Sequence, residues 1–199
     1  HPDPQTRHPP GRQRTRLSDL AGLITCSGRP PVKPSLDLAS RSPRRRDLLA
    51  AAGFEVFVVP GRDEPPLVAG DARQAALAVA TAKMPTRRAD DRPLLAADTV
   101  VALGSRLFGK PRDRQDAEAM LWALSGRRHE VVTAVALRYG AADAHFAVCS
   151  EVTFRKLSVP TVAHYLDSGE YLDKAGAYGI QGLGVSLVES VLGSYSNVV

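Results

Sequence analysis

Apolar and polar positions follow two different periods along the chain, and the switches between them predict alternating strands and helices. Short apolar runs bounded by Gly, Pro or charged residues predict strands, and apolar positions three or four residues apart predict helices. The predicted elements are strand 36–40, helix 43–52, strand 55–59, helix 70–83, strand 94–103, a turn and short strand within 104–110, helix 113–124, strands 130–138 and 146–154, helix 157–168 and strand 185–189. This order predicts an α/β fold with a mixed, twisted sheet flanked by helices.

The strand over 94–103 contains the sharpest anomaly of the pattern. Its sequence, LLAADTVVAL, is apolar on both sides of a single acid, which is typical of a central strand buried on both faces. A carboxylate in such a strand must be paired, hydrogen-bonded or placed beside a site. Asp98, with Thr99 next to it, is therefore a candidate to activate water or to hold a divalent metal. The competing interpretation is an aspartate that accepts a hydrogen bond from a nearby loop amide.

The first predicted strand leads directly into an arginine-rich helix, which is the pattern of an anion site. Ser42 suits the N-cap, Pro43 suits the first helical position, and Gly53 is placed to end the helix. The free amides of the first turn, the hydroxyls of Ser40 and Ser42, and three arginines at 44–46 would then converge where the helix dipole favours negative charge. The competing interpretation is a capped surface helix whose arginines are only solvated.

Three further polar residues are candidates to bind a phosphorylated ligand, its metal ion or its base. Lys110 lies between a glycine and a proline and suits phosphate charge, although such a turn is also common without a ligand. Glu64, in a loop rich in Gly and Pro, would complement Asp98 with the oxygen ligands that Mg²⁺ prefers, unless it belongs to a solvated acidic turn. Gln181, in the glycine-rich run 173–182, can donate and accept hydrogen bonds at once, as reading the edge of a planar base requires.

Composition and charge narrow the partners. The chain has 199 residues, 44% of them hydrophobic, with net charge +5. Residues 1–34 hold six Lys or Arg, two acids and seven prolines without apolar periodicity, so we expect a disordered extension there. Residues 35–199 hold 20 basic and 19 acidic residues, which favours a small anionic ligand over nucleic acid. Two cysteines are too few for a disulfide framework, and no apolar run is long enough for a membrane span, so we expect a cytoplasmic protein without membrane partners.

Five motifs in this order and spacing resemble the Maf family of nucleoside triphosphate pyrophosphatases, in its dTTP/UTP branch. They are LASRSPRR at 38–45, ADTV at 97–100, GKP at 109–111, LSGR at 124–127 and DKAGAYGIQG at 173–182. The resemblance covers about residues 36–199 and leaves the first 35 residues unmatched. It implies two lobes around a central nucleotide cleft, as in inosine-triphosphatase-like folds. The implied activity is hydrolysis of dTTP, UTP or modified pyrimidine nucleotides to the monophosphate and pyrophosphate with Mg²⁺ or Mn²⁺.

The resemblance also assigns roles to matching positions. Asp98 would accept the proton of the attacking water and, with Glu64, would lie at the metal. The specificity positions would be Arg44, Thr99 and Gln181, and the groups around the phosphates would be Ser40, Arg45 and Lys110. The family further suggests a homodimer.

Two departures from the family pattern give a second hypothesis. The family carries a phosphate-directed lysine on the helix that matches residues 72–78, and the alignment places Ala75 at that position, with Arg73 or Lys83 able to substitute only in another helix register. The domain over 35–199 also lacks the family's last helix, which is expected to expose apolar surface. The alternative hypothesis is therefore a catalytically weakened nucleotide-binding or regulatory protein.

Overall fold

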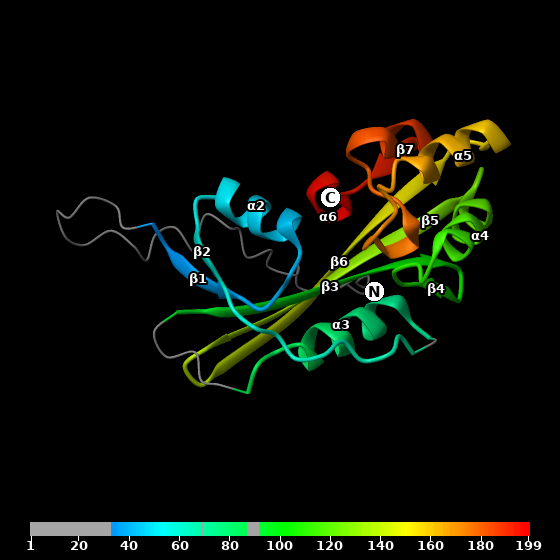
Figure 1. The fold of residues 1–199 in the computed structure, drawn as a ribbon. Helices are drawn as coiled ribbons and strands as arrows, with labels where there is room; N and C mark the ends of the chain where they lie inside the picture. The colour runs from blue at the N-terminus through cyan, green and yellow to red at the C-terminus, as the bar shows by residue number, and fades with distance from the viewer. Residues whose placement is uncertain (1–32, 69, 87–91) are drawn as a thin grey trace, which may run out of the picture. The chain divides into compact units, whose positions relative to one another are not determined.

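A mixed seven-stranded sheet lies at the centre of the described part of the chain (Figure 1). The structure is a computed structural model and describes residues 33–68, 70–86 and 92–199. The strands are β1 (Ser35–Leu38), β2 (Glu55–Val58), β3 (Leu94–Leu103), β4 (Arg106–Phe108), β5 (Arg128–Tyr139), β6 (Ala142–Phe154) and β7 (Val188–Leu192). Their order is β2-β1-β3-β5-β6-β7, and β4 pairs with β3 off this path. Only the β2-β1 and β1-β3 pairs are parallel, so the predicted mixed α/β sheet is confirmed.

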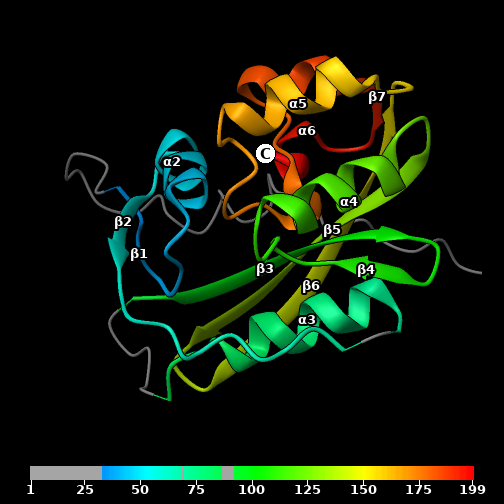
Figure 2. The same cartoon turned by 45° about the vertical axis from the view of Figure 1, so that its right-hand side comes forward.

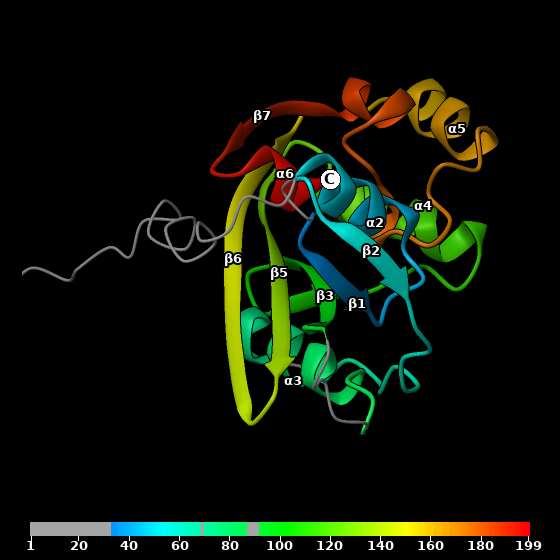
Figure 3. The ribbon, with the colours of Figure 1, turned by 90° about the vertical axis from the view of Figure 1, so that its left-hand side faces the viewer.

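Helices lie on both faces of the sheet (Figure 2). They are α2 (Pro43–Ala51), α3 (Ala72–Ala82), α4 (Arg114–Leu124), α5 (Val159–Asp167) and α6 (Tyr195–Val198), with 3-10 turns η1 (Ala175–Ala177) and η2 (Gly182–Leu187). Helix α3 covers one face, whereas α2, α4, α5 and α6 lie on the opposite side of the strands (Figures 2 and 3). No helix in the described ranges is both long and apolar enough to cross a bilayer.

Strand alternation divides the hydrophobic core between the two faces. Val100 of β3 and Val132 of β5 pack with the alanines of α3, while Val101 and Val131 pack with α4 and α5. Successive side chains of a strand point to opposite faces, so these neighbours belong to separate clusters. The apolar strand over 94–103 is therefore buried on both faces, as its pattern predicts.

Local signals place most helix ends correctly. Asp113 and Ser158 accept hydrogen bonds from the amides of Asp116 and Thr161 and so act as N-caps of α4 and α5. Ser42 occupies the N-cap position of α2, but its side chain makes no capping bond. Its own amide instead donates to Oγ of Ser40, at 3.2 Å.

Two predicted strands differ from the structure. The strand predicted at 185–189 is wrong in its first part, because residues 182–187 form η2 and β7 begins at Val188. Gly184 lies so close to the main-chain oxygen of Gly179 that any Cβ would overlap it, and this fold-back prevents an extended strand. Strand β6 begins at Ala142 rather than at 146, because a tight turn pairs Ala142 directly with Tyr139 of β5. The extension predicted as disordered falls, up to residue 32, outside the described residues.

Candidate active site

One edge of β3 is paired with other strands only near its two ends, so the pairing is interrupted in the middle of the strand. On the other edge, β3 pairs with β5 along nearly its whole length. On the interrupted edge, it pairs with the end of β1 at Leu94 and Leu95 and with β4 from Val101 onwards. Residues 96–100 therefore face no strand on that edge within the described ranges, and Asp98 lies at the middle of the interruption. Ligands of open α/β sheets bind at places where neighbouring strands diverge in this way.

Arg45 of α2 fills the interruption. Its Nη1 donates to the main-chain oxygen of Ala97 at 2.8 Å and to Oγ of Ser40 at 3.2 Å, and its Nη2 donates to Oγ1 of Thr99 at 3.0 Å. The guanidinium thus replaces a donor that a neighbouring strand would provide. Burial lowers the pKa of Arg45, and the nearby Asp98 carboxylate opposes this effect. An arginine remains cationic at neutral pH, so α2 brings a fixed positive charge to β3.

Two carboxylates and two lysines gather on the α3 side of the interruption. Nζ of Lys83, the C-cap residue of α3, lies 2.5 Å from Oδ1 of Asp98 and 3.1 Å from Oε2 of Glu64. Nζ of Lys110, which follows β4, lies 3.3 Å from the same Glu64 oxygen. We call Glu64, Lys83, Asp98 and Lys110 the acid–lysine cluster. The structure therefore brings together three residues that the sequence suggested separately, and adds Lys83.

The environment shifts the two acids of the cluster in opposite directions. Burial raises the pKa of Asp98, and the attraction of the Lys83 ammonium only partly opposes that rise. Partial burial would also raise the pKa of Glu64, but Lys83 and Lys110 together outweigh it and lower the pKa below its ordinary value. A carboxyl whose pKa lies closer to neutrality is the better proton acceptor of the two. Asp98 is thus the stronger candidate for a general base.

Lys83 corrects the expectation of a missing cation. Ala75, where the alignment placed the family's lysine, lies buried in the middle of α3 against the sheet. Helix α3 instead ends at Ala82, and its C-cap residue Lys83 reaches Asp98. The lysine beside Asp98 therefore comes from the end of α3 and not from the position of Ala75. The signal in the sequence was the position of Lys83 itself, the basic residue at the end of an alanine-rich helix.

The loop that carries Glu64 is held by close main-chain contacts. The amide of Arg62 donates to the oxygen of Lys83 at 3.0 Å. A Cβ on Gly61 would lie only 3.3 Å from the main-chain oxygens of both Ala39 and Lys83, so glycine allows the loop to pass between them. A hollow of about 490 Å³ is lined at this point by Gly61, Arg62, Asp63, Pro65 and Ala82. The side chains of Glu64 and Lys110 are 39% and 49% exposed, so the acid–lysine cluster is open to solvent on this side.

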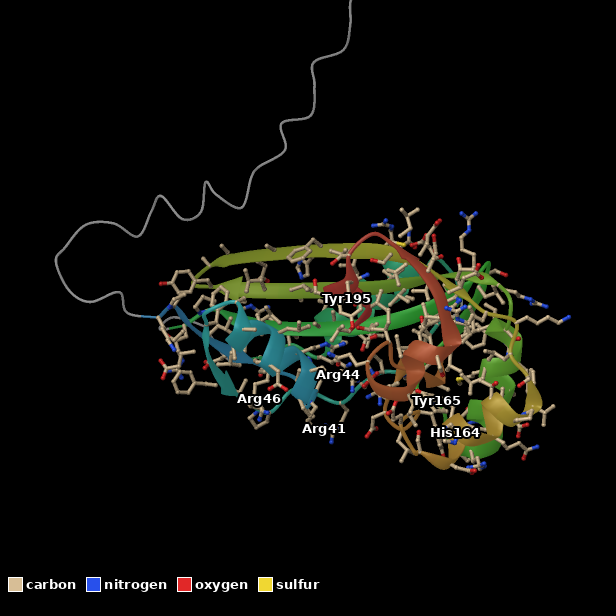
Figure 4. The ribbon with its side chains drawn as sticks, turned by 90° about the horizontal axis from the view of Figure 1, so that it is seen from above. Arg41, Arg44, Arg46, His164, Tyr165 and Tyr195 are labelled. Carbon is tan, nitrogen blue, oxygen red and sulfur yellow. The ribbon has the colours of Figure 1, made fainter. Side chains whose placement is uncertain are left out.

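The three arginines of α2 have separate partners in this structure and do not meet at one point, whereas the sequence led us to expect that they would. Arg45 is bonded within the sheet, and Arg46 forms an exposed ion pair with Asp47. Nε of Arg44 donates to the main-chain oxygen of Val199 at 3.1 Å. Figure 4 shows Arg44 between α2 and the C-terminal part of the chain, with Arg41 and Arg46 farther from the sheet. The three arginines therefore lie in different surroundings, with Arg44 and Arg45 half-buried and Arg46 exposed, and their binding of an anion stays a prediction.

Asp98 and Thr99 face opposite sides of the sheet. Asp98 lies opposite Ala134, which packs against α3, so its side chain belongs to the α3 side with Lys83. Thr99 lies opposite Thr133 and bonds Arg45 of α2 on the other side. The interruption beside β3 thus has two carboxylates and two lysines on one side, and two threonine hydroxyls with the Arg45 guanidinium on the other.

Gln181 stands apart from these contacts. It is exposed at the start of η2, and none of the hydrogen bonds among the described residues joins its side chain to Thr99 or to the acid–lysine cluster. The carboxylate of Glu170 accepts from the amides of Leu183 and Gly184, at 3.0 and 3.3 Å, and so fixes the segment that follows Gln181. The sequence did not single out Glu170. Its role depends on a hydrogen bond across 13 residues, which no local pattern reveals.

A small divalent cation fits the acid–lysine cluster, although the described residues contain no group of three or more His, Cys, Asp or Glu that could form a complete metal cage. Oxygens of Glu64 and Asp98 both lie within hydrogen-bond distance of one cationic atom, Nζ of Lys83. Mg²⁺ is commonly held by one or two carboxylates and completed by substrate phosphates and water. The donor set therefore fits such an ion better than it fits a structural metal.

The arrangement has the parts needed for displacement at phosphorus. A buried carboxylate with a raised pKa can accept a proton from water. Fixed cations beside it can stabilise the negative charge of a polyphosphate leaving group.

Comparison with known proteins agrees with this chemistry. Residues 35–199 match the family model described as Maf-like protein. The chain is 47% identical over 173 residues to a dTTP/UTP pyrophosphatase of Anaeromyxobacter dehalogenans (strain 2CP-1), covering 84% of this chain and 88% of the relative. It is 49% identical over 167 residues to the protein of the same name from Myxococcus xanthus (82% and 85%), and 46% identical over 169 residues to that from Salmonella typhimurium (83% and 86%). Because the family model covers residues 35–199 and these relatives are 46–49% identical over most of their length, this chain belongs to the Maf-like protein family.

Proposed function

We propose that this protein is a nucleoside triphosphate pyrophosphatase that hydrolyses dTTP and UTP to the monophosphate and pyrophosphate. The observation that carries the proposal is the acid–lysine cluster at the interrupted edge of β3, with Lys83 Nζ 2.5 Å from Asp98. The names of the relatives, dTTP/UTP pyrophosphatase, support the substrate assignment.

In the proposed reaction, water attacks the α-phosphorus and Asp98 accepts its proton. The bond between the α-phosphorus and the bridging oxygen breaks, and pyrophosphate leaves with that oxygen. Lys83 and Lys110 bind the phosphate oxygens as the substrate enters, exchanging part of their contact with Glu64 for contact with the substrate. Positioned cations of this kind stabilise the charge that develops on the leaving group.

The remaining candidate residues have supporting roles in this proposal. Arg45 and Ser40 hold the edge of β3 and border the phosphates, consistent with their mutual hydrogen bond. Thr99, Arg44 and Gln181 form the nucleoside side and select the substrate. Gln181 reaches the base through the mobility of an exposed side chain, since it makes no hydrogen bond to Thr99 in this structure.

We propose Mg²⁺ or Mn²⁺ as the cofactor, bound by Glu64 and Asp98. When bound, such an ion would neutralise phosphate charge and bring water and substrate together. The carboxylate pair that Lys83 bridges supports this location.

The test is pyrophosphate release from a panel of nucleoside triphosphates, with Mg²⁺, with Mn²⁺ and with chelator. We expect turnover of dTTP and UTP that chelator abolishes. Absence of turnover under all metal conditions, with nucleotide binding retained in calorimetry, would favour the weakened nucleotide-binding protein instead. That alternative depended on a missing lysine, and the position of Lys83 beside Asp98 removes its main support.

Two broader assignments accompany the proposal. Nucleoside triphosphates are cytoplasmic metabolites, which is consistent with a cytoplasmic enzyme. The homodimer implied by the family resemblance is tested by analytical ultracentrifugation, where a single species at the monomer mass would contradict it.

A further inference from the structure

A row of hydrogen bonds runs from the C-terminal helix to Thr99 and Arg45. Oγ1 of Thr133 donates to the main-chain oxygen of Asn197 at 3.3 Å. Oγ1 of Thr133 also lies 2.9 Å from Oγ1 of Thr99, which in turn accepts from Nη2 of Arg45 at 3.0 Å. We call Asn197, Thr133, Thr99 and Arg45 the hydroxyl row.

The two ends of the hydroxyl row favour one direction for the bonds between them. A carbonyl oxygen can only accept and a guanidinium can only donate. Thr133 has one hydroxyl hydrogen, and donation to Asn197 uses it. Either hydroxyl could donate in the contact between the two threonines, and the bond from Thr133 to Asn197 favours Thr99 as the donor. The hydroxyl of Thr99 then has no hydrogen left for a ligand and one lone pair free, so it can only accept from a ligand.

The acceptor at the end of the row is held firmly in place. Nδ2 of Asn197 donates to the main-chain oxygen of Val131 at 3.0 Å and to Oγ of Ser150 at 2.9 Å. Oγ of Ser150, itself fully buried, exchanges hydrogen bonds with the main chain of Ser194, at 3.0 and 3.1 Å. These bonds anchor α6 on β5 and β6. The main-chain oxygen of Asn197 therefore stays opposite Thr133.

The two threonine hydroxyls of the row lie on the side of β3 that suits a nucleoside, and Arg45 lies at the strand edge, where it bonds the oxygen of Ala97. Lys83, Lys110 and the two carboxylates occupy the other side, which suits polyphosphate. On the Thr99 side the groups nearest β3 are uncharged hydroxyls and a guanidinium already bonded to Ala97 and Ser40. An uncharged ligand group that meets Thr99 must offer it an N–H or O–H.

We propose that Thr133 is a positioning residue that holds the Thr99 hydroxyl as a hydrogen-bond acceptor, and that this selects thymine and uracil over cytosine. The ring N3 of thymine and uracil carries a hydrogen and donates, whereas N3 of cytosine is an acceptor. If cytosine were bound, its N3 and the Thr99 hydroxyl would be two acceptors facing each other, and neither would have a partner. A site with such an unpaired polar group discriminates strongly against that base. This inference rests on the proposed function and explains how the same site distinguishes pyrimidines.

The experiment measures kcat/KM of the full chain for dTTP, UTP, dCTP and CTP in wild type and two variants. Thr133→Val keeps the shape of the side chain but removes the acceptor for Thr99, which is then free to donate to cytosine N3. We expect kcat/KM for dCTP and CTP to rise, and the dTTP/dCTP and UTP/CTP ratios to fall about tenfold, the equivalent of one hydrogen bond of about 1.4 kcal/mol. Thr133→Ser retains the hydroxyl and is expected to keep the wild-type ratios.

Thr153→Val is the matched control, because Thr153 lies on β6 outside the hydroxyl row. We expect it to leave both ratios unchanged. A structural defect alone would lower all four rates together and could not raise turnover of cytosine nucleotides. Unchanged ratios in Thr133→Val, a wild-type preference for cytosine, or a change only between ribose and deoxyribose would each overturn the inference. Failure of the wild type to release pyrophosphate from any nucleotide would instead overturn the proposed function.

Discussion

Replacement of Lys83 by methionine tests the centre of the site. Methionine preserves much of the length and apolar character of the side chain, but it removes the ammonium between Asp98 and Glu64. The Lys83 side chain is only 13% exposed and that of Asp98 only 8%, so the aspartate loses its counter-charge in a place that water reaches poorly. Loss of one partner from a buried pair costs about 3 to 5 kcal/mol. Glu64 is 39% exposed, so water can solvate it after the loss of Lys83. We therefore expect the free energy of unfolding to fall by the lower limit of this range, about 3 kcal/mol.

The same substitution predicts a specific dependence of stability on pH. Burial raises the pKa of Asp98, and removal of the opposing Lys83 charge raises it further. At a pH between its pKa in the unfolded state and its higher pKa in the folded state, such a carboxyl binds more protons in the folded protein. The free energy of unfolding therefore falls as the pH rises through this range. The folded pKa is higher in the variant, so this fall extends to higher pH. The stability difference between wild type and Lys83→Met should therefore widen as the pH rises and narrow in acid.

Urea unfolding followed by circular dichroism from pH 5 to pH 8 measures this difference, and pyrophosphate release measures activity. We expect kcat/KM to fall about a hundredfold or more, as for loss of one group that stabilises transition-state charge. The control is Arg73→Met, which removes a charge from the exposed face of the same helix. A stability difference that does not change with pH, or an equal loss in the control, would refute the assignment of Lys83 to the cluster.

Three further substitutions test separate parts of the structure. Asp98→Asn should lower turnover of dTTP by about a hundredfold or more while its circular dichroism spectrum stays unchanged, because the amide cannot accept the proton; near-normal rates would exclude Asp98 as the base. Ala75→Lys should not raise activity and should lower the urea midpoint, because it forces a charge into the buried face of α3; increased turnover would show that the site does need a lysine at this position. Burial lowers the pKa of His129 from 6.5 to about 4. The contribution of the neutral imidazole to the free energy of unfolding is therefore fully present above about pH 6.5 and is lost as the pH falls to 4. This contribution is about 3 kcal/mol, and His129→Leu should lack its pH-dependent loss in urea titrations. The prediction would be contradicted if the free energy of unfolding fell with pH equally in wild type and variant.

Residues whose roles depend on near neighbours were predictable from the sequence. Asp113 and Ser158 cap helices through amides three residues away, so the local pattern contained all the information. Asp98 was identifiable for a related reason, since an acid within an apolar strand needs compensation wherever that strand lies.

Residues whose roles depend on distant partners were not predictable in the same way. Lys83 meets Asp98 because α3 ends beside the interrupted edge of β3. Arg45 bonds the sheet because, among the residues that the structure describes, no strand covers Ala97 there. The direction of the bond from Thr99 depends on Thr133 and, through it, on Asn197, which lies 64 residues farther along the chain.

The sequence by itself determined the α/β order of elements, the buried acid of β3 and the family motifs, because hydrophobic periodicity, caps and motifs are properties of neighbouring residues. The tertiary structure alone decided which lysine accompanies that acid, which arginine fills the sheet edge and which hydroxyl can accept from a ligand. Those outcomes depend on the register of β3 against β1, β4 and β5, since pairing between strands brings together groups that are far apart in the chain.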